Sequence, residues 1–174
     1  LLRAEEVDFE SIKIKNSTRE NFTVTESSSN QQFRFGMPGT EIYPDEEKLI
    51  LKTIEKLSQG AHYIVASGSM PPGISESDFL VRIARMAKKT GARFIADTSG
   101  KALQEAVNEG VYLLKPNLRE LSQLSGKESL DNDLVDDAAK ELISKGKCEV
   151  VVVSMGAQGA YLVTKDITED VQAP

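Results

Sequence analysis

The first forty residues alternate apolar and polar positions with a period of two, which is typical of β-strands that bury one face. Short strands with one apolar and one charged face suit a small antiparallel sheet that covers something on one side. We therefore expect residues 1–40 to form a small β-sheet region. The alternation occurs at 11–15, 22–25 and 33–35, with polar turn clusters between these segments at 16–17 and 27–30.

From residue 44 onward, the pattern changes to amphipathic helices that alternate with short apolar strands. This alternation, with short connections, predicts right-handed βαβ units on a mainly parallel sheet, which is the α/β fold class. Helices are predicted at residues 45–59, 79–87, 102–109, 118–124 and 133–145. Strands are predicted at residues 63–66, 93–96, 111–114, 150–153 and, after a glycine turn, 160–163.

Burial is expected to follow these patterns. The strand at 63–66 is predicted to be buried, and the one at 150–153 to be buried on both faces, because it has four β-branched residues in succession. Residues 75–78 resemble a capping box at the start of the second helix. The helix over 45–59 is expected to end at Gly60 and to bury one apolar face, made of Leu49, Ile50, Ile54 and Leu57.

The composition excludes several classes of protein. The 174 residues include 21 Lys and Arg against 27 Asp and Glu, one His and one Cys, for a net charge of −6. One Cys and one His cannot form a disulfide or a Cys/His zinc site, and we interpret Cys148 and His62 as structural. An acidic chain without a long basic run is a poor nucleic-acid or membrane-surface binder. No apolar run is long enough for a membrane span or a signal peptide, so we expect a cytoplasmic protein.

The candidate chemistry lies in the loops that follow the predicted strands, because ligands of open parallel sheets bind beyond the carboxyl ends of the strands. These loops are residues 67–73, 97–100, 115–120 and 154–159. Each is small, polar or charged, whereas the positions before it are apolar. Their convergence on one edge predicts a site for a polar small molecule.

Three of these loops have two interpretations when taken alone. The serines and glycine of residues 67–69 suit a sugar or phosphate ligand, or simply a turn between strand and helix. Asn117 and Glu120 lie on one face of a helix, where they could hold hydrated Mg²⁺ beside phosphates, but a helix cap with an acidic first turn is the commoner explanation. The glycines of Ser154-x-Gly156-x-x-Gly159 suit close approach to a nucleotide, or a β-turn.

Taken together, the loop motifs resemble the PfkB family of carbohydrate kinases. The motifs are residues 68–73, 97–100, 115–120 and 153–159, in this order and at these spacings. Residues 18–21 and 35–39 add a likeness to the bacterial 6-phosphofructokinase and tagatose-6-phosphate kinase branch. The resemblance implies a ribokinase-like three-layer sandwich with a mainly parallel sheet, present here in part. It also implies that residues 1–40 are part of a β-sheet lid and residues 41–174 part of the nucleotide- and sugar-binding kinase domain.

The resemblance also implies roles for single residues. Arg19 and Ser69 match positions that contact the phosphorylated sugar, and a guanidinium fork suits phosphate oxygens. Glu120 matches an acid linked indirectly to Mg²⁺. The positions that match contacts of the nucleotide, ATP, are Lys115, Asn117, Ser154, Gly156 and Gly159. In relatives the lid pairs with a second subunit, so a homodimer is expected for the complete protein.

One family motif is missing from the sequence. Family members carry a G-A-G-D segment whose Asp is the general base, and this chain contains no such segment, so it holds no catalytic residue of that kind. We expect the central part of an ATP- and Mg²⁺-dependent kinase that converts fructose 6-phosphate or tagatose 6-phosphate to the 1,6-bisphosphate and is inactive by itself. A 1-phosphofructokinase and a non-enzymatic nucleotide- or sugar-binding module are the alternatives.

Overall fold

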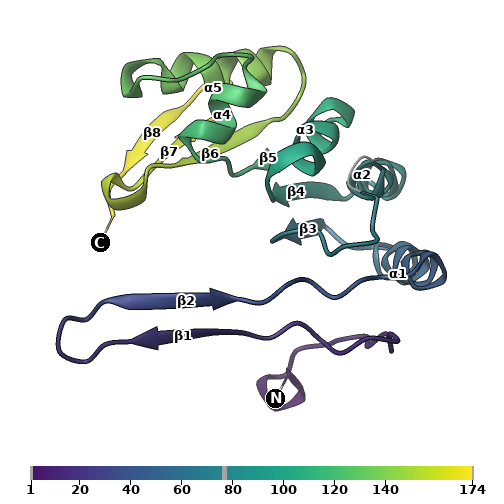
Figure 1. The fold of residues 1–174 in the computed structure, drawn as a ribbon. Helices are drawn as coiled ribbons and strands as arrows, with labels where there is room; N and C mark the ends of the chain where they lie inside the picture. Colours follow the sequence, from purple (N-terminus) through teal and green to yellow (C-terminus); the bar gives the residue numbers. More distant parts are fainter. Residues whose placement is uncertain (1, 76–77, 174) are drawn as a thin grey trace. The chain divides into compact units, whose positions relative to one another are not determined.

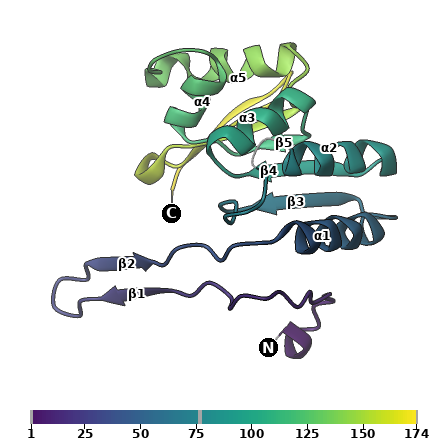
Figure 2. The ribbon, with the colours of Figure 1, turned by 45° about the vertical axis from the view of Figure 1, so that its right-hand side comes forward.

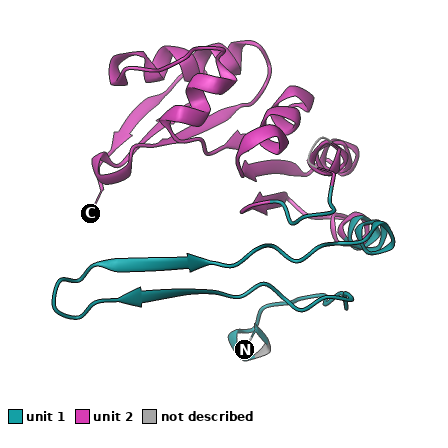
Figure 3. Cartoon of the chain, in the orientation of Figure 1, with its two compact units in different colours: residues 1–53, 70–74 teal, residues 54–69, 75–174 magenta. Residues whose placement is uncertain are grey.

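The computed structural model describes residues 2–75 and 78–173, and the chain divides into two compact units. Unit 1 comprises residues 1–53 and 70–74, and unit 2 comprises residues 54–69 and 75–174 (Figure 3). Two residues of the predicted capping box, 76 and 77, lie outside the described residues. No helix of the described residues is long and apolar enough to cross a membrane.

Unit 1 contains a short 3₁₀ turn, η1 (Leu2–Glu5), and a two-stranded antiparallel hairpin of β1 (Asn21–Thr25) and β2 (Gln32–Gly36) (Figure 1). The hairpin confirms the strands predicted at 22–25 and 33–35. Its register pairs Phe22 with Phe35 and Val24 with Phe33, so these four side chains share one face. The rings of Phe22 and Phe35 stack at 4.8 Å, yet all four side chains are about half exposed.

The strand predicted at residues 11–15 is wrong. These residues form no β-ladder, and the main-chain N–H of Lys15 donates instead to Glu46 Oε1 at 2.6 Å. The burial still alternates, because Ile12 and Ile14 are half-buried between exposed neighbours. The alternation of apolar residues therefore correctly indicated which side chains are half-buried. It did not establish a β-strand, because a strand also needs a neighbouring strand as a hydrogen-bonding partner.

Helix α1 (Pro44–Leu57) begins at a proline, one residue before the predicted start, and has three acids in its first turn. It ends two residues before the predicted end, and Gly60 follows at φ 77°. The predicted apolar face is partly wrong. Leu49 and Leu57 are exposed, whereas Leu51 is buried with only 4% of its surface accessible. Apolar residues occupy more than one face of this helix, so the helical period alone does not predict which face is buried.

Unit 2 is a six-stranded mixed sheet in the order β3-β4-β5-β6-β7-β8. The first four strands run parallel, and β7 and β8 are antiparallel additions. The strands are β3 (Tyr63–Ser67), β4 (Arg93–Asp97), β5 (Leu113–Leu114), β6 (Val150–Ser154), β7 (Ala160–Val163) and β8 (Thr168–Val171). The α/β class is confirmed, while the short polar strand β8 was not predicted.

The helices of unit 2 are α2 (Phe79–Thr90), α3 (Gly100–Glu109), α4 (Leu118–Leu124) and α5 (Val135–Ser144), with 3₁₀ turns η2 (Asn132–Leu134) and η3 (Gly156–Gln158). The bounds of α4 are those predicted, and α3 begins two residues earlier than predicted. Figures 1 and 2 show α2 to α5 along the same face of the sheet. Leu114, Val151 and Val153 are fully buried in the core of this unit.

The opposite face of the sheet explains two burial predictions that are wrong. Val150 and Val152 are only half-buried, and Val65 on β3 is 61% exposed. Side chains alternate between the two faces of a sheet, so one helical layer buries only every second residue. Within residues 2–75 and 78–173, the helices α2 to α5 supply that layer on one face.

Candidate functional site

The loops that follow the four parallel strands meet at one small cavity of about 250 Å³. The cavity lies at the carboxyl edge of the sheet, where a parallel arrangement gathers the ends of successive strands. The convergence predicted from the sequence is therefore confirmed for one residue or more of each loop. The lining residues are Gly68, Asp97, Thr98, Ser99, Lys115, Asn117, Glu120 and Ser154.

A lysine and an aspartate form an ion pair in this cavity. Lys115 Nζ lies 3.1 Å from Asp97 Oδ1, and the two side chains are 44% and 38% exposed. Ser67 Oγ donates a long hydrogen bond of 3.4 Å to the second oxygen, Asp97 Oδ2. The aspartate thus contacts residues from the ends of β3 and β5 while it ends β4 itself.

Asp97 is a site residue that the sequence analysis did not single out. Its main-chain carbonyl accepts a hydrogen bond from the N–H of Gly68 at 2.9 Å, and Thr98 Oγ1 donates to the carbonyl of Gly68 at 2.7 Å. These bonds tie the ends of β3 and β4 together. The available signal was its position as the first charged residue after a predicted strand.

Asn117 and Glu120 form a complete capping box at the start of α4. Asn117 Oδ1 accepts from the N–H of Glu120 at 2.9 Å, and Glu120 Oε2 accepts from the N–H of Asn117 at 2.9 Å. The helix-cap interpretation is confirmed, and it leaves the second carboxylate oxygen, Oε1, outside this reciprocal pair. The metal role of Glu120 remains a prediction.

Ser154 lies in the cavity, but the two glycines that follow it do not line it. The N–H of Ser154 donates to the carbonyl of Pro116 at 2.9 Å, which holds the end of β6 against the start of α4. Gly159 has φ 97°, and a Cβ there would lie 2.0 Å from the carbonyl oxygen of Val171. Close approach of β8 therefore requires this glycine, whatever its role toward a nucleotide. Gly156 has φ 60° with open space around it.

The two residues expected to contact the sugar belong to different units. Arg19 is in unit 1, where its Nε donates to Asn21 Oδ1 at 3.2 Å. Ser69 is exposed in the loop after β3, in unit 2. The sugar-binding roles of both residues remain predictions.

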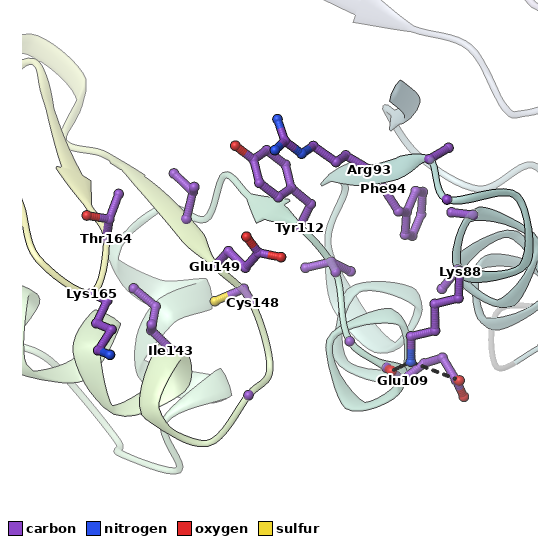
Figure 4. A pocket seen from close by; sticks show the side chains of 18 of the residues that line it. Lys88, Arg93, Phe94, Glu109, Tyr112, Ile143, Cys148, Glu149, Thr164 and Lys165 are labelled. Atoms are coloured by element: carbon purple, nitrogen blue, oxygen red, sulfur yellow. Dashed lines mark hydrogen bonds and ion pairs between the residues drawn. The ribbon is translucent and has the colours of Figure 1, made fainter. Parts of the chain in front are cut away.

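A larger cavity, of about 780 Å³, opens at the amino edge of the same sheet (Figure 4). Its walls come from the first residues of β4 and β6, and from the last turns of α2, α3 and α5. The guanidinium of Arg93 lies 4.7 Å from the centre of the Tyr112 ring and donates to the hydroxyl of Tyr63 at 3.1 Å. Three helices end here, and the carbonyls at helix C-termini repel anions such as phosphate.

Three charged residues of the larger cavity, Lys88, Arg93 and Glu109, have partners within the protein. Arg85 and Lys88 both contact the carboxylate of Glu109, and these bonds, chiefly that from Arg85, lower the pKa of this carboxyl. Burial raises the pKa of the Cys148 thiol to about 12, which supports a structural role for this residue. We take the smaller cavity as the candidate site because residues from four loops, most of them polar or charged, line it, although the other cavity is larger.

The residues around the smaller cavity include carboxylates that can supply oxygen ligands, but they do not form a metal site made of several protein ligands. In the part of the chain that the structure describes, there is no cluster of three or more His, Cys, Asp and Glu side chains that could hold a metal ion. Asp97 and Glu120 line one cavity with a lysine, which is a combination of charges that suits a phosphate-bound cation.

Comparisons with known proteins agree with the sequence motifs. The sequence profile of the pfkB family carbohydrate kinases matches residues 1–174. The ATP-dependent 6-phosphofructokinase isozyme 2 of Mycobacterium tuberculosis is 43% identical over 159 residues, or 91% of this chain and 46% of that protein. The 1-phosphofructokinase of Rhodobacter capsulatus is 34% identical over 152 residues, or 87% of this chain and 48% of that protein.

A solved structure also matches. The crystal structure of phosphofructokinase-2 from Escherichia coli in complex with fructose-6-phosphate superposes with a TM-score of 0.88 at 38% identity. The match covers 100% of this chain and 57% of that one, and it confirms the fold class expected from the sequence. The chain spans about half the length of the relatives it matches.

Proposed function

Because the chain belongs to the pfkB family of carbohydrate kinases, we propose that its complete protein is an ATP-dependent kinase of a phosphorylated ketohexose. The favoured reaction is phosphorylation of fructose 6-phosphate or tagatose 6-phosphate to the 1,6-bisphosphate. The observation that carries the proposal is the convergence of Lys115, Asn117, Glu120 and Ser154 on one cavity at the carboxyl edge of the sheet.

The nucleotide would lie against this edge. Bound ATP supplies the phosphoryl group that is transferred. The ammonium of Lys115 would neutralise phosphate oxygens, while Asn117, Ser154 and the glycine turn from Gly156 to Gly159 would line the nucleotide. Phosphoryl transfer depends on positioning and charge stabilisation, which are functions that these residues can perform without covalent chemistry.

Mg²⁺ fits the same edge through Glu120. Mg²⁺ prefers oxygen ligands and keeps several waters, so it needs only one or two carboxylates from the protein. Glu120 Oε2 is engaged in the capping box, whereas Oε1 lies outside that pair and would hold a water molecule of the hydrated ion. This arrangement makes the role of Glu120 indirect.

The sugar phosphate would be bound by Arg19, through its phosphate, and by Ser69. Residues 1–40 would form part of a lid over the sugar, and the apolar face of the β1–β2 hairpin would pair with a second subunit in a cytoplasmic homodimer. Burial of four half-exposed apolar side chains favours such pairing. The proton of the sugar hydroxyl needs a base, and the 174 residues contain no G-A-G-D motif that would supply it. The activity is therefore assigned to the complete protein.

The test uses the protein expressed from its full open reading frame, with ATP and Mg²⁺. We expect turnover of fructose 6-phosphate or tagatose 6-phosphate, whereas a preference for fructose 1-phosphate would support a 1-phosphofructokinase. Binding without turnover of any of the three sugars would support a non-enzymatic module.

The Arg19→Ala variant tests the sugar side of the site. We expect it to raise the KM for the sugar phosphate at least tenfold and to leave the KM for ATP within about twofold, because a guanidinium–phosphate contact is strong and local. Arg34→Ala, in strand β2 of the hairpin that follows Arg19, is the matched control. Equal effects of Arg19→Ala on both substrates would contradict its placement at the sugar phosphate.

A further inference from the structure

Glu46 is a buried carboxylate that lines neither of the two cavities described above. It lies in the first turn of α1 with 6% of its surface accessible, and a buried carboxylate is costly unless hydrogen bonds replace its water. Both of its oxygens accept a main-chain N–H, Oε1 from Lys15 at 2.6 Å and Oε2 from Tyr43 at 2.9 Å. The bond from Tyr43, which directly precedes the helix, caps α1. The bond from Lys15 is not needed for this cap, and it joins the helix to a segment distant in sequence.

The two donors belong to the two ends of the loop that carries the β1–β2 hairpin. We call residues 15–17 the incoming stem and residues 40–43 the outgoing stem, and Figures 1 and 2 show these segments side by side. Neither stem forms a strand. Side chains join them instead, because Asn16 Nδ2 donates to the carbonyl of Glu41 at 3.0 Å and Thr40 Oγ1 donates to the carbonyl of Ser17. The carboxylate of Glu46 thus closes the base of a long loop.

The outgoing stem also has a fixed seat on residues 70–74, which belong to the same unit. The N–H of Ile42 donates to the carbonyl of Pro72 at 2.8 Å. Gly73 has φ 86°, and a Cβ there would lie 2.1 Å from the carbonyl oxygen of Ile42. This close approach requires a glycine. The outgoing stem is therefore held by main-chain contacts, whereas the incoming stem is held to it and to α1 through side chains.

The position of the incoming stem matters for Arg19. Residues 18–20 are the whole connection between this stem and β1, so a shift of the stem is transmitted to Arg19. A group that positions a substrate loses much of its effect when it is misplaced by about 1 Å. A fixed stem therefore keeps the guanidinium where a sugar phosphate can use it.

We propose, on the basis of the proposed function, that Glu46 is a positioning residue that holds Arg19 in place for the sugar phosphate. It acts through the main chain of Lys15 and does not contact the substrate. Its removal should therefore weaken binding of the sugar phosphate, and only while Arg19 is present.

A double-mutant cycle on the protein from the full open reading frame tests this, with Glu46→Ala and Arg19→Ala. We expect Glu46→Ala to raise the KM for the sugar phosphate about tenfold and to leave kcat and the KM for ATP within about twofold. The double variant should have the same KM for the sugar phosphate as Arg19→Ala alone, because residues that act as a unit are not additive. Glu55→Gln, which removes an exposed carboxylate from the same helix, is the control and should change none of these values.

Amide hydrogen exchange follows the two hydrogen bonds without any substrate. We expect the N–H of Lys15 to exchange at least about tenfold faster in Glu46→Ala and at an unchanged rate in Glu55→Gln. Because Glu46→Ala also removes the helix cap, Glu46→Gln is measured beside it. Its single amide oxygen can serve only one of the two N–H groups. The KM for the sugar phosphate should rise in Glu46→Gln if Lys15 loses its acceptor, and stay unchanged if Tyr43 does.

The outcomes separate the role of Glu46 from the proposed function. An unchanged exchange rate of Lys15 in Glu46→Ala, equal increases of both KM values, or independent effects of Glu46→Ala and Arg19→Ala would each overturn the role of Glu46. A KM for the sugar phosphate that does not change in Arg19→Ala would instead refute the assignment of Arg19 in the proposed function, and the role of Glu46 with it. Absence of kinase activity in the unmodified protein would refute the proposed function as a whole.

Discussion

The two edges of the sheet in unit 2 differ in a way that cavity size does not reveal. The amino edge has a cavity about three times larger than that of the carboxyl edge, at about 780 Å³ against 250 Å³. At the amino edge, however, α2, α3 and α5 end, so main-chain carbonyls face the space. At the carboxyl edge, α3 and α4 begin, and main-chain N–H groups face it. The polarity of the backbone therefore favours the carboxyl edge over the amino edge for an anionic ligand, although the cavity at the amino edge is larger.

The cationic side chains of the two edges also differ in how strongly they are engaged within the protein. At the amino edge, Arg93 contacts two tyrosines and Lys88 contacts Glu109, so these cations already have partners. At the carboxyl edge, Lys115 forms a solvent-accessible ion pair with Asp97. The first arrangement stabilises a packed surface, and the second leaves a positive charge available to a ligand.

The largest expected effect is a loss of stability from a substitution in the core of the sheet, because the core supports both edges. Leu114 on β5 is fully buried, and the residues that flank this two-residue strand line the two cavities, Tyr112 the larger one and Lys115 the smaller one. Leu114→Ala should lower the free energy of unfolding by about 2–5 kcal/mol, because a buried leucine leaves a cavity when it is truncated. Denaturant titration measures this, with Leu134→Ala at an exposed position as the control. A loss no larger than that of the control would contradict the burial of Leu114 in the core.

A second prediction concerns the amino edge alone. Burial raises the pKa of the Cys148 thiol from its ordinary value of 9.0 to about 12. At pH 9 the reactive thiolate should therefore be several hundredfold rarer in the folded than in the unfolded chain, by a difference of about three pH units. Alkylation by iodoacetamide should be slower by about that factor without urea than with it. Equal rates would show that the thiol is accessible.

The same shift has a consequence for stability. Between pH 9 and 12 the folded chain retains a thiol proton that the unfolded chain loses. The unfolded state then binds fewer protons, so the free energy of unfolding should fall as the pH rises above about 9. In Cys148→Ala this contribution should disappear.

The smallest expected effect is a change in the Mg²⁺ requirement after a substitution of Glu120 at the carboxyl edge. Glu120→Gln preserves the capping box, because glutamine also accepts from the N–H of Asn117, but it removes the charge. In the protein expressed from the full open reading frame, we expect this variant to need about 10- to 100-fold more Mg²⁺ for activity, with little change in stability. Glu120→Ala should show the same requirement and also lose about 1 kcal/mol of stability with the cap. A normal Mg²⁺ requirement in Glu120→Gln would assign Glu120 to the helix cap alone.

The sequence predicted the parts of the structure that depend on neighbours along the chain. Helix α4 has its predicted bounds because Asn117 and Glu120 set its start locally. The convergence of the loops followed from the direction of parallel strands. The ladder expected at 11–15, the burial of Val65 and the contacts of Asp97 depend on segments distant in sequence. Periodicity carries no information about such partners.

The position of β3 at the end of the six-stranded order has a practical consequence for expression. Within the described residues, β3 pairs only with β4, and its Tyr63 and Val65 are exposed. A strand edge with free N–H and C=O groups and apolar side chains is a template for intermolecular β-pairing. The 174-residue chain, if produced alone, is therefore prone to aggregate through this edge, and a lysine in place of Val65 is the simplest remedy.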